Sequence, residues 1–306
     1  MAQAKYVPIF TGTTGLDNTV DPVRLKLDLK TGITQLARAV NVDVDKSGRV
    51  NRRLGYQQKS ATSCTQSFAD GEKCYVVAGA TLRQLNPDYS FTTLRSDLTP
   101  GLRMSFWPIA GRVYYTNGSE RGYIAKSQDN VWTAGTYAGI KTNRTFSDPP
   151  KGHLVSWFGG RALVAVENVV FASEPSQYGR FDLAKTFRAE ADRITMLSPT
   201  SAGLLVGTKS KTVLWKGDEF LKLQREVLSN AGVVEGSLAF CEPGDLPKDT
   251  FAGVHEGRVN LFVTPNGICA LDDRGNFVKL TDLDFPTSQY ATAAVHGGRY
   301  LVLIQP

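Results

Sequence analysis

Four arginines follow a glycine and lead into an apolar strand, and they are the side chains best suited to bind a charged partner. A guanidinium is permanently cationic, and its fork of N–H donors fits the oxygens of a phosphate or a carboxylate. If these residues occupy equivalent positions of a repeat, they form a basic collar on one rim, able to face phosphate or an acidic partner. The interpretation that we favour is that they are solvated turn residues. The four are Arg112, Arg161, Arg258 and Arg299.

The carboxylates and histidines form no recognisable catalytic or metal-binding motif. Glycoside hydrolysis needs two facing carboxylates, and no pair stands out among the 29 Asp and Glu residues. The sequence has no GxSxG nucleophile turn and no phosphate-binding glycine loop. His255 and His296 precede glycine turns of different repeats, and with His153 they favour packing over metal ligation. We therefore predict no catalytic activity, no metal and no cofactor.

Two segments match known loops only in part. Asp43–Gly48 begins like a calcium loop, but Leu54 stands where an EF-hand has its twelfth-position glutamate, so a hairpin turn is favoured. Ser127–Trp132 resembles the Asp-box turn of sialidase-like propellers without its glycine. Neither segment indicates a binding site.

The elements that must position these residues repeat with a period in the forties. Each repeat has a glycine-led turn followed by an apolar strand, and the six glycines are 40, 49, 43, 54 and 41 residues apart. Short strands at this period are typical of radially repeated β-architecture, in which neighbouring units bury one another's apolar faces. The glycines are Gly71, Gly111, Gly160, Gly203, Gly257 and Gly298.

Strands and turns within each repeat predict a four-stranded antiparallel meander. We therefore expect an all-β fold, a β-propeller of about six four-stranded blades, with five and seven blades as the alternatives. The sixth repeat reaches Pro306 after two strands, and the predicted hairpin Ala39–Arg53 would supply the other two and close the last blade. This divides the chain into an N-terminal arm, 1–38, and a propeller domain, 39–306. The best helix candidate, 181–192, is expected to be a surface insertion.

Composition is that of a globular protein and points to no specialised class. The chain has 306 residues with 35 basic and 29 acidic side chains, a net charge of +6 that is compatible with a nearby polyanion. No signal-like or 18-residue apolar segment is present, so we expect a soluble protein made in a reducing cytoplasm, without membrane insertion. The cysteines, which lack CxxC spacing and are expected to be free thiols, are Cys64, Cys74, Cys241 and Cys269.

Several stretches resemble the tail nozzle proteins of short-tailed bacteriophages, also called tail tubular or packaged-DNA stabilisation proteins. The first is the hairpin segment with its "NV…D..G…RR.G" pattern, and the others follow in the expected order as far as Leu280. The matching stretches are 37–56, 113–118, 157–165, 170–175, 203–208 and 230–234.

The resemblance implies a structural virion protein with no enzymatic activity. It implies a homohexameric ring below the portal and adaptor (the head-to-tail connector), in contact with other tail proteins and enclosing a channel that retains or passes DNA without reading its sequence. The protein would be assembled in the host bacterial cytoplasm and reside in the virion tail. The N-terminal arm would dock on a neighbouring ring or subunit, with Arg24, Lys26 and Lys30 as candidate contacts. The chain is shorter than many nozzles, so tip domains that contact fibres or the cell envelope are not expected.

Two functions of other classes stay open. A carbohydrate-binding or carbohydrate-cleaving propeller would use Trp107, Trp132 and Trp157 at a sugar face, whereas the alternative for these residues is packing inside the blades. A general protein-interaction propeller is the third hypothesis.

Overall fold

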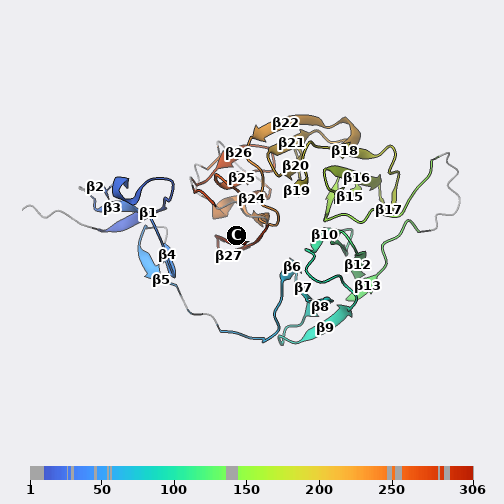
Figure 1. The fold of residues 1–306 in the computed structure, drawn as a ribbon, viewed down its shortest axis with the longest axis horizontal. Helices are drawn as coiled ribbons and strands as arrows, with labels where there is room; N and C mark the ends of the chain where they lie inside the picture. The colour runs from blue at the N-terminus through green and yellow to red at the C-terminus, as the bar shows by residue number, and fades with distance from the viewer. Residues whose placement is uncertain are drawn as a thin grey trace, which may run out of the picture.

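The protein consists of strands joined by short turns. The computed structural model describes residues 10–25, 27–28, 31–44, 47–53, 55, 57–135, 144–246, 250–251, 257–281, 283–285 and 290–305. Across these ranges the only helical segments are three short 3-10 turns: η1 (Pro22–Arg24), η2 (Phe220–Lys222) and η3 (Pro243–Asp245). The chain is therefore all-β, as predicted (Figure 1).

Five antiparallel sheets follow one another between residues 66 and 279. Each is a meander whose strands pair in sequence order, and β18 pairs additionally with β16 in the third sheet. The strands are β6 (Gln66–Asp70), β7 (Lys73–Ala78), β8 (Thr81–Leu85) and β9 (Phe91–Arg95); β10 (Ser105–Ile109), β11 (Arg112–Thr116), β12 (Arg121–Ala125) and β13 (Gln128–Asn130); β14 (Leu154–Phe158), β15 (Arg161–Val166), β16 (Val169–Glu174), β17 (Gln177–Phe181) and β18 (Phe187–Ala189); β19 (Ile194–Thr200), β20 (Gly203–Thr208), β21 (Thr212–Lys216) and β22 (Gln224–Ser229); β23 (Ala239–Cys241), β24 (Val259–Thr264), β25 (Gly267–Leu271) and β26 (Phe277–Lys279).

A sixth sheet, the pair β27 (Tyr290–His296) and β28 (Arg299–Gln305), completes the circle. Figure 1 shows the six sheets arranged around a common centre. The first strand of every sheet lines the same central cavity, which is the arrangement of blades in a β-propeller. The predicted fold and the count of about six blades are confirmed.

The apolar core lies between neighbouring sheets. Each buried cluster combines side chains from two consecutive sheets: Leu82 with Ile124, Tyr114 with Val164, Leu163 with Leu204, Leu205 with Phe262, and Leu261 with Tyr300. Among the described residues no such cluster joins the sixth sheet to the first. The ring therefore has a seam between β28 and the first sheet.

Gly203 is required because β20 begins in close contact with the backbone of β21. Gly203 opens β20 with a φ of +148°, and a Cβ built there would lie 2.1 Å from the carbonyl oxygen of Trp215 on β21. A side chain at this position would push the two strands apart. One of the glycines that marked the repeat is thus fixed by a close backbone approach.

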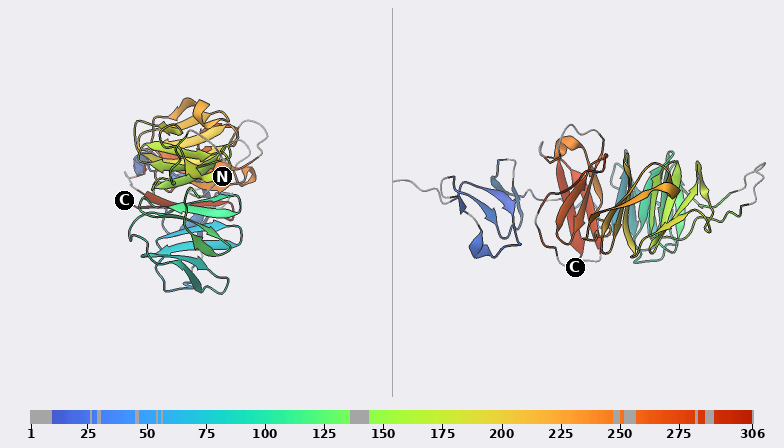
Figure 2. Two further views of the ribbon diagram at one scale, coloured as in Figure 1. Left: turned by 90° about the vertical axis from the view of Figure 1, so that its right-hand side faces the viewer. Right: turned by 90° about the horizontal axis from the view of Figure 1, so that it is seen from above.

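The described residues between 10 and 53 form a separate N-terminal unit outside the ring (Figure 2). A sheet in the order β1-β3-β2 is followed by the β4-β5 hairpin. The backbone N–H of Thr13 donates to the carbonyl oxygen of Gly48 at 2.8 Å, which fastens the hairpin to β1. The strands are β1 (Gly12–Leu16), β2 (Leu27–Asp28), β3 (Ile33–Leu36), β4 (Val42–Val44) and β5 (Val50–Arg52).

The predicted closure of the last blade by the hairpin 39–53 is not found. In the described residues β4 pairs only with β5 and β28 only with β27. The hairpin uses its backbone against β1, so it meets the sixth sheet through side chains: Arg299 Nη1 lies 2.7 Å from Asp43 Oδ2. Asn18 and the backbone of Asp284 exchange two further hydrogen bonds.

The predicted helix over 181–192 is wrong. Phe181 is fully buried at the end of β17, and Phe187–Ala189 forms β18 against β16. The backbone N–H of Thr186 donates to the carbonyl oxygen of Asp182, which closes a turn between the two strands. Burial of Phe181 between blades holds this segment in the sheet, against its local helical pattern.

Removing a side chain from the core between the third and fourth sheets tests this packing. Leu163→Ala, at a fully buried position, is expected to lower the free energy of unfolding by about 2–5 kcal/mol through lost burial and a residual cavity. Leu221→Ala, at an exposed position of η2, should change it by less than about 0.5 kcal/mol. Urea unfolding followed by tryptophan fluorescence measures both, and equal losses would contradict the assignment of the core.

Candidate functional site

The centre of the ring is hollow. One cavity of about 470 Å³ lies where the first strands begin, and a second of about 550 Å³ lies further along the same strands. Volumes of this size suit a small molecule. They are too small for a nucleic-acid duplex, so the propeller itself cannot thread duplex DNA through its centre.

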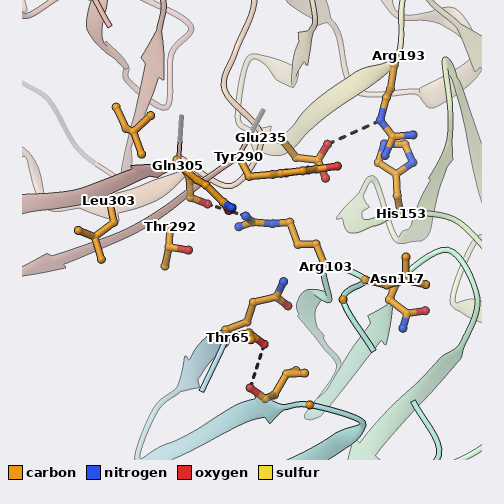
Figure 3. Close-up of a pocket in the computed structure, with 17 residues that line it drawn as sticks. Thr65, Arg103, Asn117, His153, Arg193, Glu235, Tyr290, Thr292, Leu303 and Gln305 are labelled. Atoms are coloured by element: carbon orange, nitrogen blue, oxygen red, sulfur yellow. Dashed lines mark hydrogen bonds and ion pairs between the residues drawn. The ribbon is translucent and has the colours of Figure 1, made fainter. Parts of the chain in front are cut away.

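All six sheets contribute a polar side chain to the first cavity, here called the channel mouth. Each of these residues stands at or shortly before the start of a first strand, so the ring geometry brings them together from distant parts of the sequence (Figure 3). They are Gln66, Arg103, His153, Arg193, Glu235 and Tyr290.

Arg193 and Glu235 form the ionic pair of the mouth. Arg193 Nε lies 3.8 Å from Glu235 Oε2, and its Nη1 also contacts the carboxylate of Glu167 at the rim. Glu235 is only 5% exposed, and burial raises the pKa of its carboxyl group, while the neighbouring arginines act in the opposite direction. The charge of Arg193 is therefore shared between two carboxylates.

Arg103 enters the mouth without an ion-pair partner among the described residues. Its Nη1 donates to the carbonyl oxygen of Ala291 at 2.6 Å, and Figure 3 shows its guanidinium reaching toward Tyr290 and β27. Burial lowers the pKa of Arg103, partly offset by Glu235. A Cβ built at Gly236 would lie 1.7 Å from Nη2, so that glycine makes room for the guanidinium.

His153 is a structural residue of the mouth. Its Nε2 lies 2.6 Å from the carbonyl oxygen of Ile194, and burial lowers the pKa of the ring, which favours the neutral form at pH 7. His296 is exposed at the end of β27, and His255 lies outside the described residues. No cluster of three metal-ligating side chains occurs in the described part of the chain.

The four turn arginines begin, or directly precede, second strands, at the opposite end of the sheets from the mouth. They thus share one rim, as expected, but they have partners of their own. The Arg112 guanidinium carbon lies 4.9 Å from the centre of the Tyr123 ring, and Arg161 donates to the carbonyl oxygen of Ser173 at 2.6 Å.

Arg258 and Arg299 are also engaged. Arg258 stacks over Phe240, 3.7 Å from the ring centre, and borders the second cavity. Arg299 forms the ion pair with Asp43 described above. A phosphate or acidic partner for this rim stays a prediction. In the N-terminal unit Arg24 is exposed at the end of η1, and Lys26 and Lys30 lie outside the described residues.

The three tryptophans proposed for a sugar face separate into two groups. Trp132 is 2% exposed and donates from Nε1 to the carbonyl oxygen of Tyr178 at 2.9 Å, so it packs inside the blades. Trp107 and Trp157 line the second cavity together with Phe240, and Trp157 is 36% exposed. An aromatic wall is therefore present in the centre of the ring.

Comparison with known proteins supports the fold. No protein-family model matches the chain, and no curated protein matches it. Among solved structures, BBS1N in complex with ARL6DN, soaked with lead, is 11% identical with a TM-score of 0.50 over 86% of this chain and 85% of that one. The Neurospora crassa Pan2 WD40 domain is 11% identical with a TM-score of 0.45 over 76% of this chain and 69% of that one.

The extracellular domain of the putative hybrid two component system BT4673 from B. thetaiotaomicron is 11% identical with a TM-score of 0.44. The match covers 78% of this chain but spans only 30% of that one. At these identities the likeness extends to the fold alone. Within the described residues no helix has the length and apolarity needed to cross a membrane.

The sequence does not predict the channel mouth, and it names His153 only as a histidine expected to pack. The residues of the mouth share no residue type, and they stand at different distances before their strands: His153 directly precedes β14, whereas Glu235 lies four residues before β23. The one feature they share in the sequence is their position at or before the start of the strand that leads into each glycine turn. That shared position is the signal that could have identified them.

The pH dependence of stability tests the hydrogen bonds of Glu120, in the turn that also carries Asn117, a residue lining the channel mouth. Burial raises the pKa of Glu120, but hydrogen bonds from Thr99 and Asn117, both at 2.5 Å, outweigh it and bring the value to about 2, below the ordinary 4.5. The stabilisation is therefore complete above pH 4.5 and is lost as the pH falls toward 2. Urea midpoints measured across this range should fall more steeply for the wild type than for Glu120→Gln; coincident profiles would contradict the shift.

Proposed function

We propose that this propeller is a structural protein of a short-tailed phage tail, a nozzle-like subunit that forms a ring below the portal and adaptor. The ring encloses the DNA channel and retains or passes the genome without catalysis. The motif order from Arg38 to Leu280 supports the family. One structural observation carries the proposal: the first resembling segment, 37–56, contributes β4 and β5 to a unit that stands outside the propeller and contacts the sixth sheet through the Asp43–Arg299 ion pair.

The sixth sheet supplies a complementary surface. Leu301 and Leu303 are 46% and 79% exposed on the face of β28 that looks away from the fifth sheet. An open strand edge beside exposed leucines is a template for association with another chain. We assign this surface to the N-terminal unit of a second copy, because Asp43 already shows its complementarity to Arg299.

The DNA channel in this proposal lies between subunits. The two central cavities of the propeller, about 470 and 550 Å³, exclude a duplex from the centre of one subunit. DNA would instead follow the axis of the ring, and the net charge of +6 suits such a position. Arg112, exposed on the turn rim, is a candidate for that inner surface.

The mass of the assembly tests the proposal. Mass photometry or electron microscopy of the purified chain, alone and with an adaptor ring, is expected to show a hexamer of the 33.4 kDa subunit, about 200 kDa. Leu301→Asp should shift the population toward monomer at least tenfold, because it places a charge in the apolar contact. Leu221→Asp, at another exposed leucine on η2, is the matched control and should assemble normally.

A carbohydrate-binding propeller is the second candidate, favoured by the aromatic wall of the second cavity. Trp107, Trp157 and Phe240 offer ring faces of the kind that stack on sugars. A glycan array with the wild type and Trp157→Ala examines it: binding that drops at least tenfold in the variant supports a sugar site. A stable monomer with such binding would replace the phage-tail proposal, whereas a ring with no glycan binding leaves that proposal in place.

A further inference from the structure

We propose that the channel mouth binds a small oxyanion, a phosphate or carboxylate group, on the guanidinium of Arg103. This site does not depend on the proposed function, since one propeller contains all of its residues. It is also distinct from the turn rim, which lies at the other end of the sheets.

Arg103 forms no ion pair among the described residues, and Glu235 acts on it only from a longer distance. Glu235 is the one carboxylate among the described lining residues, and it faces Arg193 at 3.8 Å. Arg193 contacts Glu167 as well. Arg103 has only the Ala291 carbonyl oxygen as a hydrogen-bond acceptor in the described part of the chain. A desolvated cation with a single neutral acceptor is costly, and a bound anion offsets that cost.

The donor geometry suits an oxyanion. A guanidinium carries five N–H donors in a planar fork, and one hydrogen bond to Ala291 leaves further donors for two oxygens of a ligand. Gln66 lines the same cavity, and its carbonyl oxygen accepts the backbone N–H of Met104 at 2.5 Å. That bond assigns the oxygen of Gln66 to the backbone, which leaves the amide NH₂ as a second, neutral donor for the ligand.

The cavity has room for the ligand, and Gly236 preserves the position of Arg103. The mouth encloses about 470 Å³, enough for a phosphate with a small organic group. Any side chain at Gly236 would collide with Nη2 of Arg103. Gly236 has a φ of +83° and lies directly beside the guanidinium of Arg103.

Thermal unfolding in the presence of inorganic phosphate tests the site directly. At constant ionic strength, set with KCl, phosphate is expected to raise the Tm of the wild type by roughly 2–4 °C in a saturable manner. Arg103→Met keeps the aliphatic stem but removes the charge, so its Tm should not respond. Arg274→Met, which removes an exposed arginine of the turn between β25 and β26, away from the mouth, is the matched control and should respond like the wild type.

A second arm distinguishes the source of the oxyanion and guards against a variant that fails to fold. Acetate replaces phosphate: a saturable rise with acetate identifies a carboxylate ligand, and a rise with phosphate alone identifies a phosphate ligand. Arg103→Lys keeps the charge without the fork and should weaken binding at least tenfold by isothermal titration calorimetry. Equal Tm shifts in the wild type and Arg103→Met, or no saturable shift of the wild type with either anion, would overturn the proposal.

Discussion

Burial of sheet faces against one another is the constraint on which the whole molecule depends. A meander of four short strands exposes two apolar faces, and one sheet cannot cover both by itself. Leu163 and Leu204, from the third and fourth sheets, are buried only because those sheets meet face to face. Repeating this contact around a centre converts five local meanders and a final hairpin into a ring. The ring in turn fixes where every first strand begins, and therefore where the polar side chains of the mouth converge.

In the described part of the chain, this face-to-face burial is missing at the seam between the sixth and first sheets. Between the sixth and first sheets the described residues form no buried apolar cluster, and Leu301 and Leu303 stay exposed. The N-terminal unit reaches the sixth sheet by the Asp43–Arg299 ion pair and the Asn18–Asp284 hydrogen bonds. An exposed ion pair contributes about 0–1 kcal/mol. A connection this weak within one chain can be exchanged for the equivalent connection between two copies with little loss.

The architecture could be predicted from the sequence because its signals are local. A glycine turn followed by an apolar strand fixes a hairpin wherever it occurs, and its period fixes a radial repeat. The partner of the hairpin 39–53 could not be predicted, because it depends on the backbone bond between Thr13 and Gly48, 35 residues apart. The segment after Phe181 has a helical pattern, but burial of that phenylalanine between blades decides its structure. The site escaped prediction for a related reason: its residues share a place in the ring and no common motif.

Exposure to water distinguishes the arginines of the turn rim from Arg103, which lies in the mouth at the other end of the sheets. Arg112 is exposed on the turn rim, where water satisfies its donors at little cost, so its recurrence there requires no ligand. Arg161 and Arg258 use a carbonyl oxygen and an aromatic ring. At the mouth, burial lowers the pKa of Arg103 and Glu235 offsets this only in part, while the guanidinium has no ion-pair partner among the described residues. The recurrence of arginine at the turn rim therefore supports an anion site less strongly than the burial of Arg103 beside a single carbonyl acceptor does.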